Sequence, residues 1–298
     1  MDIDKIQSFV TVCSTKNFTD AAEQLYTSQA NISKHLKSIE TELQCQLILR
    51  KGRQFDLTEA GEVFLVYAEN IIRTYQQAIN ELNMVKTNEK VRLSFGTTAS
   101  IGANILPKYL SNFKYTEPTT KLSMKIDQSQ EILNLLNKGQ IDFAILSHYI
   151  TQGLNSYKYI PLIEDKLIVI VPPNHPLAKK ESCKLSELNK ETFLIKHSQA
   201  SLNKYLAQEL NHPPFLTENR LEVGSQNNIK HFVQNGLGIS IVSTSLIREE
   251  LKEGKIGIIE IEGLQLTRTI NIVIPKNKKL FPTSINFVKY LTKNVRNL

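Results

Sequence analysis

Two short helical patterns, joined by a few polar residues, constrain the fold of the N-terminal region more tightly than any other feature of the chain. Thr19 can cap the first helix and Ser28 the second, because both residue types are favoured at helix starts. The apolar positions recur at helical spacing, with Ala22, Leu25 and Tyr26 in the first helix and Ile32, Leu36 and Ile39 in the second. Two short helices joined by so tight a turn predict a helix-turn-helix.

The polar side of the second helix carries amide, hydroxyl and cationic groups, which are the groups that reach base edges and phosphates in a major groove. With the turn before it, this side gives the candidate DNA contacts Thr27, Ser28, Gln29, Asn31, Ser33, Lys34 and Lys37, and it also includes His35. A solvated face on an ordinary helical hairpin is the alternative.

Downstream, three cations surround a glycine, which predicts a turn against the phosphate backbone; they are Arg50, Lys51 and Arg53. Leu57 then returns to the core, and Thr58 starts another helix. A helix pair followed by a basic hairpin favours a winged helix-turn-helix that binds DNA.

A long helix is predicted from Thr58 to about Thr87, where proline is absent and glycine occurs only at Gly61. About 30 helical residues extend about 45 Å. Apolar residues recur along one side, so the helix needs a partner, and a second copy of the chain is the natural one. Two such copies present two recognition helices to one palindromic site. The alternative is that this helix packs only on the rest of its own chain.

The remainder of the chain alternates between strand and helix patterns, which predicts an α/β fold with a largely parallel sheet. The predicted strands are 91–96, 121–126, 142–146, 164–172, 193–196, 220–223, 239–243 and 268–274. The predicted helices are 102–114, 129–138, 199–210, 225–235 and 282–295.

Polar side chains gather where these strands end, which is where open α/β sheets bind ligands and where helix N-termini favour anions. The candidate ligand contacts are Thr98, Ser100, Gln128, Ser147, Lys196, His197, Ser198 and Ser225. Serine and threonine at helix starts are also ordinary N-caps, and for any one of them capping alone is an equal alternative.

On these residues the chain resembles the LysR-type transcriptional regulators along its whole length. The matching positions are Phe9, Val10, Phe18, Thr19, Ala21, Ala22, Leu25, Ser28, Gln29, Ser33, Leu36, Ile39, Glu40, Leu43, Leu47, Arg50, the run Leu57–Gly61 and the run His175–Ala178. Two positions depart from the family pattern: Ala30 stands where proline is common, and Asn31 where a small or apolar residue is usual. An amide at position 31 can pair with adenine, so this departure can change which base is read.

The resemblance implies three domains and an oligomer. They are a DNA-binding domain over 1–58, a dimerising linker helix over 59–89, and a two-lobed effector domain over 90–298. Within the effector domain, one lobe covers about 90–163 and 268–298, and the other about 164–267. The resemblance also implies a homodimer or homotetramer on promoter DNA, with a small-molecule effector between the lobes near the first-strand hydroxyls and Lys196.

The charge distribution and the cysteine content restrict which further functions the chain can have. Residues 1–90 carry 10 Lys and Arg against 12 Asp and Glu, whereas residues 91–298 carry 26 against 17. The excess positive charge therefore lies in the effector half, where it favours a lysine-rich surface, and attraction of an anionic metabolite is the alternative. Cys183 lies among Lys179, Lys180 and Lys184, which predicts a lowered thiol pKa. One cysteine in this half does not allow an intramolecular disulfide switch.

No phosphate loop, nucleophile elbow or metal-ligand spacing is present, so neither an enzyme nor a cofactor is expected. The N-terminus lacks the layout of a signal peptide, and no apolar stretch approaches a membrane span, which predicts a cytoplasmic protein. A solute-binding protein is the alternative suggested by the two-lobed half alone, and the DNA-binding pattern argues against it.

Overall fold

The computed structural model describes residues 1–51, 54–86, 92–197, 200–210, 213, 219–276 and 278–295. For residues 50, 51, 54, 55, 77, 80, 81 and 83–86 the description covers the backbone only. The chain divides into two compact units, residues 1–89 with the segment 137–140, and residues 90–136 with 141–298. No helix within the described residues is long and apolar enough to cross a membrane.

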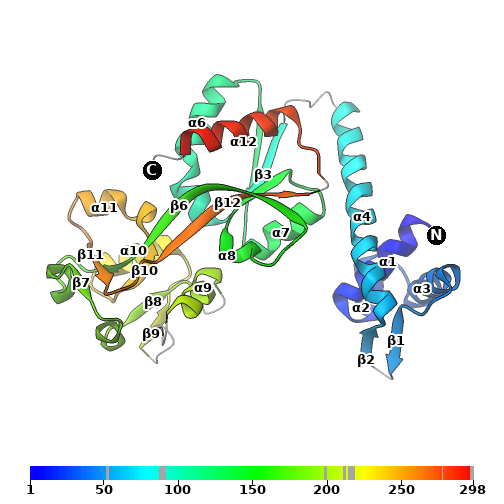
Figure 1. Ribbon diagram of the computed structural model, residues 1–298, viewed down its shortest axis with the longest axis horizontal. Coiled ribbons are helices and arrows are strands. Elements are labelled where there is room, and N and C mark those ends of the chain that lie inside the picture. Colours follow the sequence, from blue (N-terminus) through cyan, green and yellow to red (C-terminus); the bar gives the residue numbers. More distant parts are fainter. Residues whose placement is uncertain are drawn as a thin grey trace. The chain divides into compact units, whose positions relative to one another are not determined.

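The first unit contains the predicted helix pair. Helices α1 (Ile3–Thr15), α2 (Phe18–Gln24) and α3 (Gln29–Leu43) pack around a small core in which Phe9, Ile32, Leu36 and Ile39 are fully or almost fully buried (Figure 1). Ser28 caps α3 as predicted, since its Oγ accepts the backbone N–H of Asn31 at 3.2 Å.

Two predictions for α2 were wrong. Asn17, not Thr19, caps this helix: its Oδ1 accepts the N–H of Thr19 at 2.8 Å, so the helix begins two residues earlier. Tyr26 does not join the apolar face but is 98% exposed, because it follows the end of the helix with a φ of 51° and points away from the core.

A two-stranded hairpin and a long helix complete this unit. Strands β1 (Ile48–Lys51) and β2 (Gln54–Leu57) pair antiparallel, and α4 spans Glu59–Lys86. The Thr58 hydroxyl accepts the N–H of Gly61 at 2.9 Å and so caps α4. A Cβ on Gly61 would lie 2.1 Å from the carbonyl oxygen of Leu47, so α4 can approach the hairpin backbone only at a glycine.

The second unit is built on one curved sheet, with strand order β4-β3-β5-β12-β6-β11-β7 and β10 also paired to β6, and on the separate pair β8-β9. The strands are β3 (Arg92–Thr97), β4 (Lys121–Ile126), β5 (Phe143–Ser147), β6 (Tyr157–Val171), β7 (Ser182–Cys183), β8 (Phe193–Ile195), β9 (Arg220–Glu222), β10 (Ser240–Ser243), β11 (Gly257–Ile261) and β12 (Thr267–Pro275). The sheet is mixed, where a largely parallel one was predicted, because β12 runs antiparallel to both β5 and β6, and β10 and β11 run antiparallel to β6.

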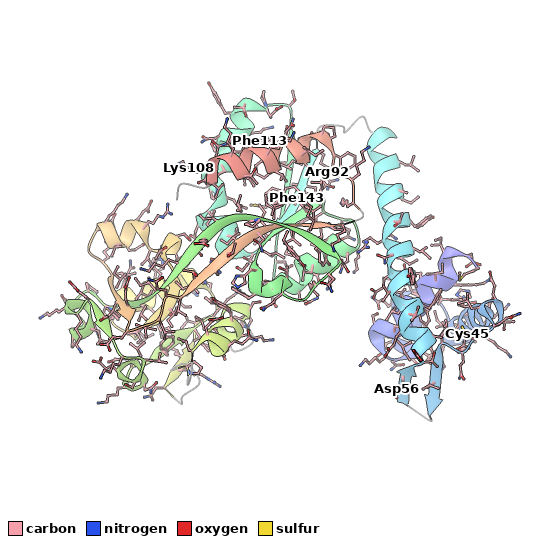
Figure 2. The ribbon with its side chains drawn as sticks, in the orientation of Figure 1. Cys45, Asp56, Arg92, Lys108, Phe113 and Phe143 are labelled. Carbon is pink, nitrogen blue, oxygen red and sulfur yellow. The ribbon has the colours of Figure 1, made fainter. Side chains whose placement is uncertain are left out.

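Helices cover both faces of this sheet. They are α5 (Ala99–Asn104), α6 (Leu106–Thr116), α7 (Ser129–Asn137), α8 (His148–Thr151), α9 (Ser201–Glu209), α10 (Gln226–Gln234), α11 (Arg248–Lys252) and α12 (Pro282–Asn294). In the first lobe, Phe287 of α12 packs on Phe113 and Phe143, the two rings labelled in Figure 2, with ring centroids 4.8 and 6.3 Å away, while α7 covers the opposite face.

In the second lobe, the apolar run from Leu167 to Val171 is buried on both sides. Leu167, Val169 and Val171 face the core that includes α9, and Ile168 and Ile170 face the core that includes α10. An apolar run buried on both faces is typical of α/β sheets.

Two long strands, β6 and β12, run side by side from one lobe to the other (Figure 1). The sequence predicted a strand over 164–172, but β6 begins earlier, at Tyr157, and passes through Pro161. Proline is tolerated there because, among the described strands, β6 pairs with β12 alone over this stretch, and the register shifts beside it, between Ile270 and Asn271.

Candidate functional site

The polar side of α3 exposes part of the predicted DNA-reading set. Ser28, Gln29, Lys34 and Lys37 are exposed, while Thr27, Asn31 and Ser33 are partly buried. The helix therefore offers amide, hydroxyl and ammonium groups on one accessible side, as a recognition helix requires.

Two side chains of this helix are held by contacts within the unit. The Asn31 amide donates to the hydroxyl of Thr27 at 3.0 Å. His35, grouped with the DNA-facing residues from the sequence, lies instead with its Nδ1 2.8 Å from the hydroxyl of Ser8 on α1. The prediction that His35 lies on the DNA-facing side was wrong, because this turn of α3 faces α1 and the imidazole contacts Ser8 there.

The predicted basic hairpin is present as the β1–β2 pair, in which Arg50 lies opposite Phe55 and Lys51 opposite Gln54. The side chains of Arg50 and Lys51 and the whole of Arg53 lie outside the described residues. The backbone thus supplies a wing beside the recognition helix.

A cavity of about 200 Å³ lies between the two lobes of the second unit. The first residues of α5, α7, α9 and α10 line it, and backbone N–H groups at such helix ends favour negative charge. The structure brings together six of the predicted contacts around this cavity, namely Thr98, Ser100, Gln128, Lys196, His197 and Ser225.

Two predicted contacts remain, Ser198 and Ser147. Ser198 lies outside the described residues. Ser147 is 4% exposed and is absent from the described lining. The chain turns from Ser147 directly into α8, which buries this side chain and brings Tyr149 to the cavity instead.

The remaining hydroxyls differ in whether they cap a helix. Ser225 caps α10, since its Oγ accepts the N–H of Asn228 at 3.1 Å. Thr98 occupies the N-cap of α5 without a side-chain cap bond. The Oγ of Ser100 is buried and has no partner among the described residues. Thr98 and Ser100 are therefore better placed for a ligand than for a structural role.

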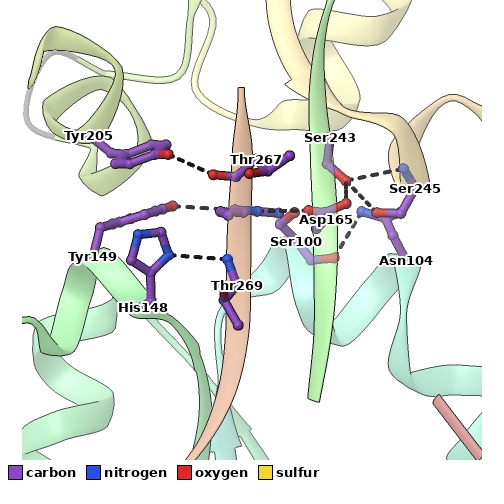
Figure 3. A network of polar contacts seen from close by, with 11 residues as sticks. Ser100, Asn104, His148, Tyr149, Asp165, Tyr205, Ser243, Ser245, Thr267 and Thr269 are labelled. Atoms are coloured by element: carbon purple, nitrogen blue, oxygen red, sulfur yellow. Dashed lines mark hydrogen bonds and ion pairs between the residues drawn. The ribbon is translucent and has the colours of Figure 1, made fainter. Parts of the chain in front are cut away.

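Sequence reasoning missed a buried polar network beside the cavity (Figure 3). Arg268 lines the cavity, and its Nε donates to Asp165 at 2.7 Å. The other oxygen of Asp165 accepts the hydroxyl of Ser243 at 2.6 Å. Tyr149 accepts from Arg268 at 3.4 Å and stacks on Tyr205 of the other lobe, with ring centroids 4.6 Å apart.

The charge on Arg268 is secured by these partners. Burial alone would lower its pKa, but Tyr149 and Asp165 outweigh burial and raise it above the usual value. In the sequence, Arg268 and Asp165 stand at the polar ends of apolar strands and resemble solvent-exposed residues. Only the pairing of β6 with β12, which sets them opposite each other, reveals the site.

The prediction of a lowered pKa for Cys183 was wrong. Burial raises the pKa of this thiol, Glu187 raises it further, and Lys180 only partly offsets them. The side chain is fully buried in the second lobe, so the lysines that flank it in sequence do not control its chemistry. Among the described residues, no three His, Cys, Asp or Glu side chains are grouped as a metal site requires.

Comparison with known proteins places both units in one family. Residues 3–62 match the model of the bacterial regulatory helix-turn-helix protein, lysR family, and residues 86–296 match the LysR substrate binding domain. A probable RuBisCO transcriptional regulator of Thalassiosira pseudonana is 34% identical over 277 residues, which cover 91% of this chain and 90% of the relative. The HTH-type transcriptional regulator CysL of Bacillus subtilis is 28% identical over 301 residues, covering 98% and 100%.

Solved structures agree with these matches. An H2O2-bound mutant of OxyR from Corynebacterium glutamicum superimposes with a TM-score of 0.59 at 26% identity, covering 98% of this chain and 92% of that one. Full-length CbnR in complex with its target DNA shares the fold, with a TM-score of 0.55 at 20% identity. The chain therefore belongs to the LysR family of DNA-binding transcriptional regulators, which carry an effector-binding domain and are not enzymes.

Proposed function

We propose that this regulator reads promoter DNA as a dimer or tetramer and responds to a small anionic metabolite bound between the lobes of its second unit. The observation that carries the DNA-reading role is the exposed polar side of α3, capped by Ser28 and followed by the β1–β2 wing. Residues 1–58, 59–89 and 90–298 then act as DNA-binding domain, linker helix and effector domain. Because the protein binds promoter DNA, we place it in the cytoplasm.

Each DNA contact has a proposed role. Gln29 and Asn31 read base edges, as amides do. Lys34, Lys37, Arg50, Lys51 and Arg53 bind phosphates, and the hydroxyls of Thr27, Ser28 and Ser33 fix the register of α3. The exposure of Gln29, Lys34 and Lys37 supports these roles. The Asn31 side chain, at the start of the helix, is partly buried and donates to Thr27.

Self-association is proposed through α4. The buried side of this helix packs into the core of the first unit through Ala68, with Phe64 and Ile72 beside it. Along its length the helix also exposes a set of apolar side chains, which are Val63, Val66, Tyr67, Ile71, Tyr75, Ile79 and Leu82. Water-exposed apolar rows of this length mark interaction sites, and a second copy of α4 is the partner with the same chemistry.

The metabolite is proposed to occupy the cavity between the lobes and to contact Thr98, Ser100, Gln128, Lys196, His197, Ser198 and Ser225. The helix N-termini and Lys196 supply positive potential, and Asp127 is the carboxylate among the described lining residues. The buried position of Ser147 argues against a ligand contact there.

Selection of genomic DNA fragments by the purified full-length protein, at a stated near-physiological salt concentration, tests this function. We expect a small set of fragments that share an imperfect palindrome, because two recognition helices read two half-sites. The genes beside these fragments then identify the pathway and nominate the metabolite. Uniform recovery of all fragments, with or without metabolites of the neighbouring genes, would contradict sequence-specific reading.

A further inference from the structure

Arg268 lies at the point where the chain passes between the lobes. It is directly opposite Asp165 in the antiparallel pair of β12 and β6, the two strands that connect the lobes. Both oxygens of Asp165 are engaged, one by Arg268 and one by Ser243 (Figure 3). The ion pair is therefore fixed from both sides in the connecting ribbon.

This guanidinium has more donors than its partners use. Arginine carries five N–H donors and no acceptor. Within the described residues, Nε bonds Asp165, Nη1 bonds Tyr149, and Nη2 has no partner although the side chain is only 3% exposed. A buried N–H without an acceptor costs free energy, so an unpaired guanidinium edge beside a cavity calls for an incoming acceptor.

The hydroxyl of Ser100 is a second buried polar group that needs a hydrogen-bond partner. Ser100 lines the cavity with Arg268, and its buried Oγ has no partner among the described residues. Ser100 lies on α5 of the first lobe, and α5 contacts the 3-10 turn Thr244–Leu246, which directly follows Ser243 in the second lobe. An arginine edge from the ribbon and a hydroxyl from the first lobe thus border one cavity.

We propose that Arg268 is the anchor for the acid group of the effector, and that this group is a carboxylate or phosphate which also accepts the Ser100 hydroxyl. This inference rests on the proposed function of the cavity. An oxyanion offers acceptors only, which complements the unused donors, and arginine binds carboxylate and phosphate through two parallel N–H groups. Lys196 adds a second cation to the lining.

The position of this anchor gives the ligand a direct route to the ribbon. An oxyanion that engages Nη2 pulls on a side chain whose Nε holds Asp165 on β6 and whose Nη1 contacts Tyr149, which stacks on Tyr205. Occupancy therefore acts on the two connecting strands and on an aromatic contact between the lobes. A ligand held only by Ser225 or Gln128 would lack this route.

Thermal unfolding of the full-length protein, titrated with inorganic phosphate, with acetate and with neutral glycerol at constant ionic strength, tests the anchor. R268K keeps a cation opposite Asp165 but lacks the second donor edge. The double variant R268M/D165N removes both charges together, so that no buried carboxylate is left unpaired. R220M, which removes an exposed arginine of β9 outside the cavity lining, is the matched control.

We expect at least one oxyanion, and not glycerol, to raise the Tm of the wild type and of R220M. In R268K and R268M/D165N the concentration for half the shift should rise roughly 10- to 100-fold, the usual cost of losing a hydrogen bond to a charged group. If only phosphate raises the Tm, the acid group is a phosphate, and if only acetate raises it, the acid group is a carboxylate. Because phosphate stabilises proteins nonspecifically, the difference between wild type and variants is the readout.

Equal oxyanion shifts in all four proteins, or no oxyanion shift in the wild type, would overturn the anchor. Neither result touches the proposed reading of promoter DNA, which the selection of genomic fragments by the same wild-type protein decides. Loss of sequence-specific fragments with an intact Arg268-dependent shift would instead overturn DNA reading and leave the anchor standing.

Discussion

At the scale of single residues, one hydrogen bond decides whether a polar side chain is available to a ligand. On α3, His35 contacts Ser8, whereas Gln29 and Lys34 stay exposed. In the cavity, Ser225 caps a helix, whereas Ser100 has no partner among the described residues. Residue type alone does not separate these cases, since all of them are polar residues at helix starts or on helix surfaces.

Lys34→Ala should weaken binding to every DNA sequence by a similar factor and lower the slope of log K against log salt by about 1, because one phosphate contact is lost. Gln29→Ala should relax discrimination at one base position by about 1–3 kcal/mol. Fluorescence anisotropy on the operator and on point-mutated operators, at several salt concentrations, measures both. Lys252→Ala, an exposed lysine of α11, is the control. A uniform loss for Gln29→Ala would assign it to the backbone instead.

Cys13 should resist alkylation in the folded protein. Burial, and then Glu69, raises the pKa of its thiol to about 12 from the usual 9.0. Because the thiolate is the nucleophile and a raised pKa keeps the thiol protonated at pH 7.5, its reaction with iodoacetamide should be slowed by about ten-fold or more. Peptide mass spectrometry over time, with Cys45, which is partly buried like Cys13, as the internal comparison, measures this. Equal rates at Cys13 and Cys45 would show that burial does not protect the thiol.

At the scale of elements, close packing explains positions that periodicity leaves ambiguous. The pattern from Thr58 onward predicts a helix, and α4 follows it from Glu59 to Lys86. The pattern gives no reason for Gly61, which interrupts it. The reason is the carbonyl of Leu47 from the neighbouring hairpin, a contact between segments that are distant in sequence.

Gly61→Ala should destabilise the first unit by about 1–3 kcal/mol, because a methyl group at 2.1 Å from a backbone oxygen forces the helix away from the hairpin. Chemical denaturation followed by circular dichroism measures the change. Gln76→Ala, at an exposed position of the same helix, is the control and should change stability little. An alanine at 61 that is neutral or stabilising would show that α4 does not approach the hairpin this closely in solution.

The double change Tyr67→Lys and Ile79→Lys should shift the protein from dimer or tetramer towards monomer. Tyr67 is 64% exposed and Ile79 40%, so the substitutions should cost the folded chain little while placing charges in an apolar contact. Sedimentation velocity at several concentrations measures the shift. Glu62→Lys is the control for added charge, because Glu62 is exposed and lies about 140° around α4 from Tyr67 and about 100° from Ile79. An unchanged oligomer in the double variant would place the interface elsewhere.

At the scale of the whole molecule, the sequence predicts the elements better than their pairing. The strand 121–126 and the helix pair follow from local periodicity and caps. Most predicted cavity residues follow from the rule that ligands lie at strand ends. Arg268 and Asp165 could not be predicted in this way, because they are 103 residues apart and meet only through the pairing of two connecting strands. The mixed sheet is missed for the same reason, since strand direction depends on where the chain crosses between lobes.

Effector and operator should alter each other's binding by the same factor. If a metabolite nominated by the operator-linked genes changes operator affinity tenfold, saturating operator must change the metabolite's affinity tenfold, because the two paths around the binding cycle have equal free energy. Operator affinity by fluorescence anisotropy and metabolite affinity by calorimetry, on the same full-length protein, test this. R268K should weaken metabolite binding and leave the metabolite-free operator affinity unchanged, because Arg268 lies in the second unit. A metabolite that binds equally with and without operator would not be the signal this protein transmits.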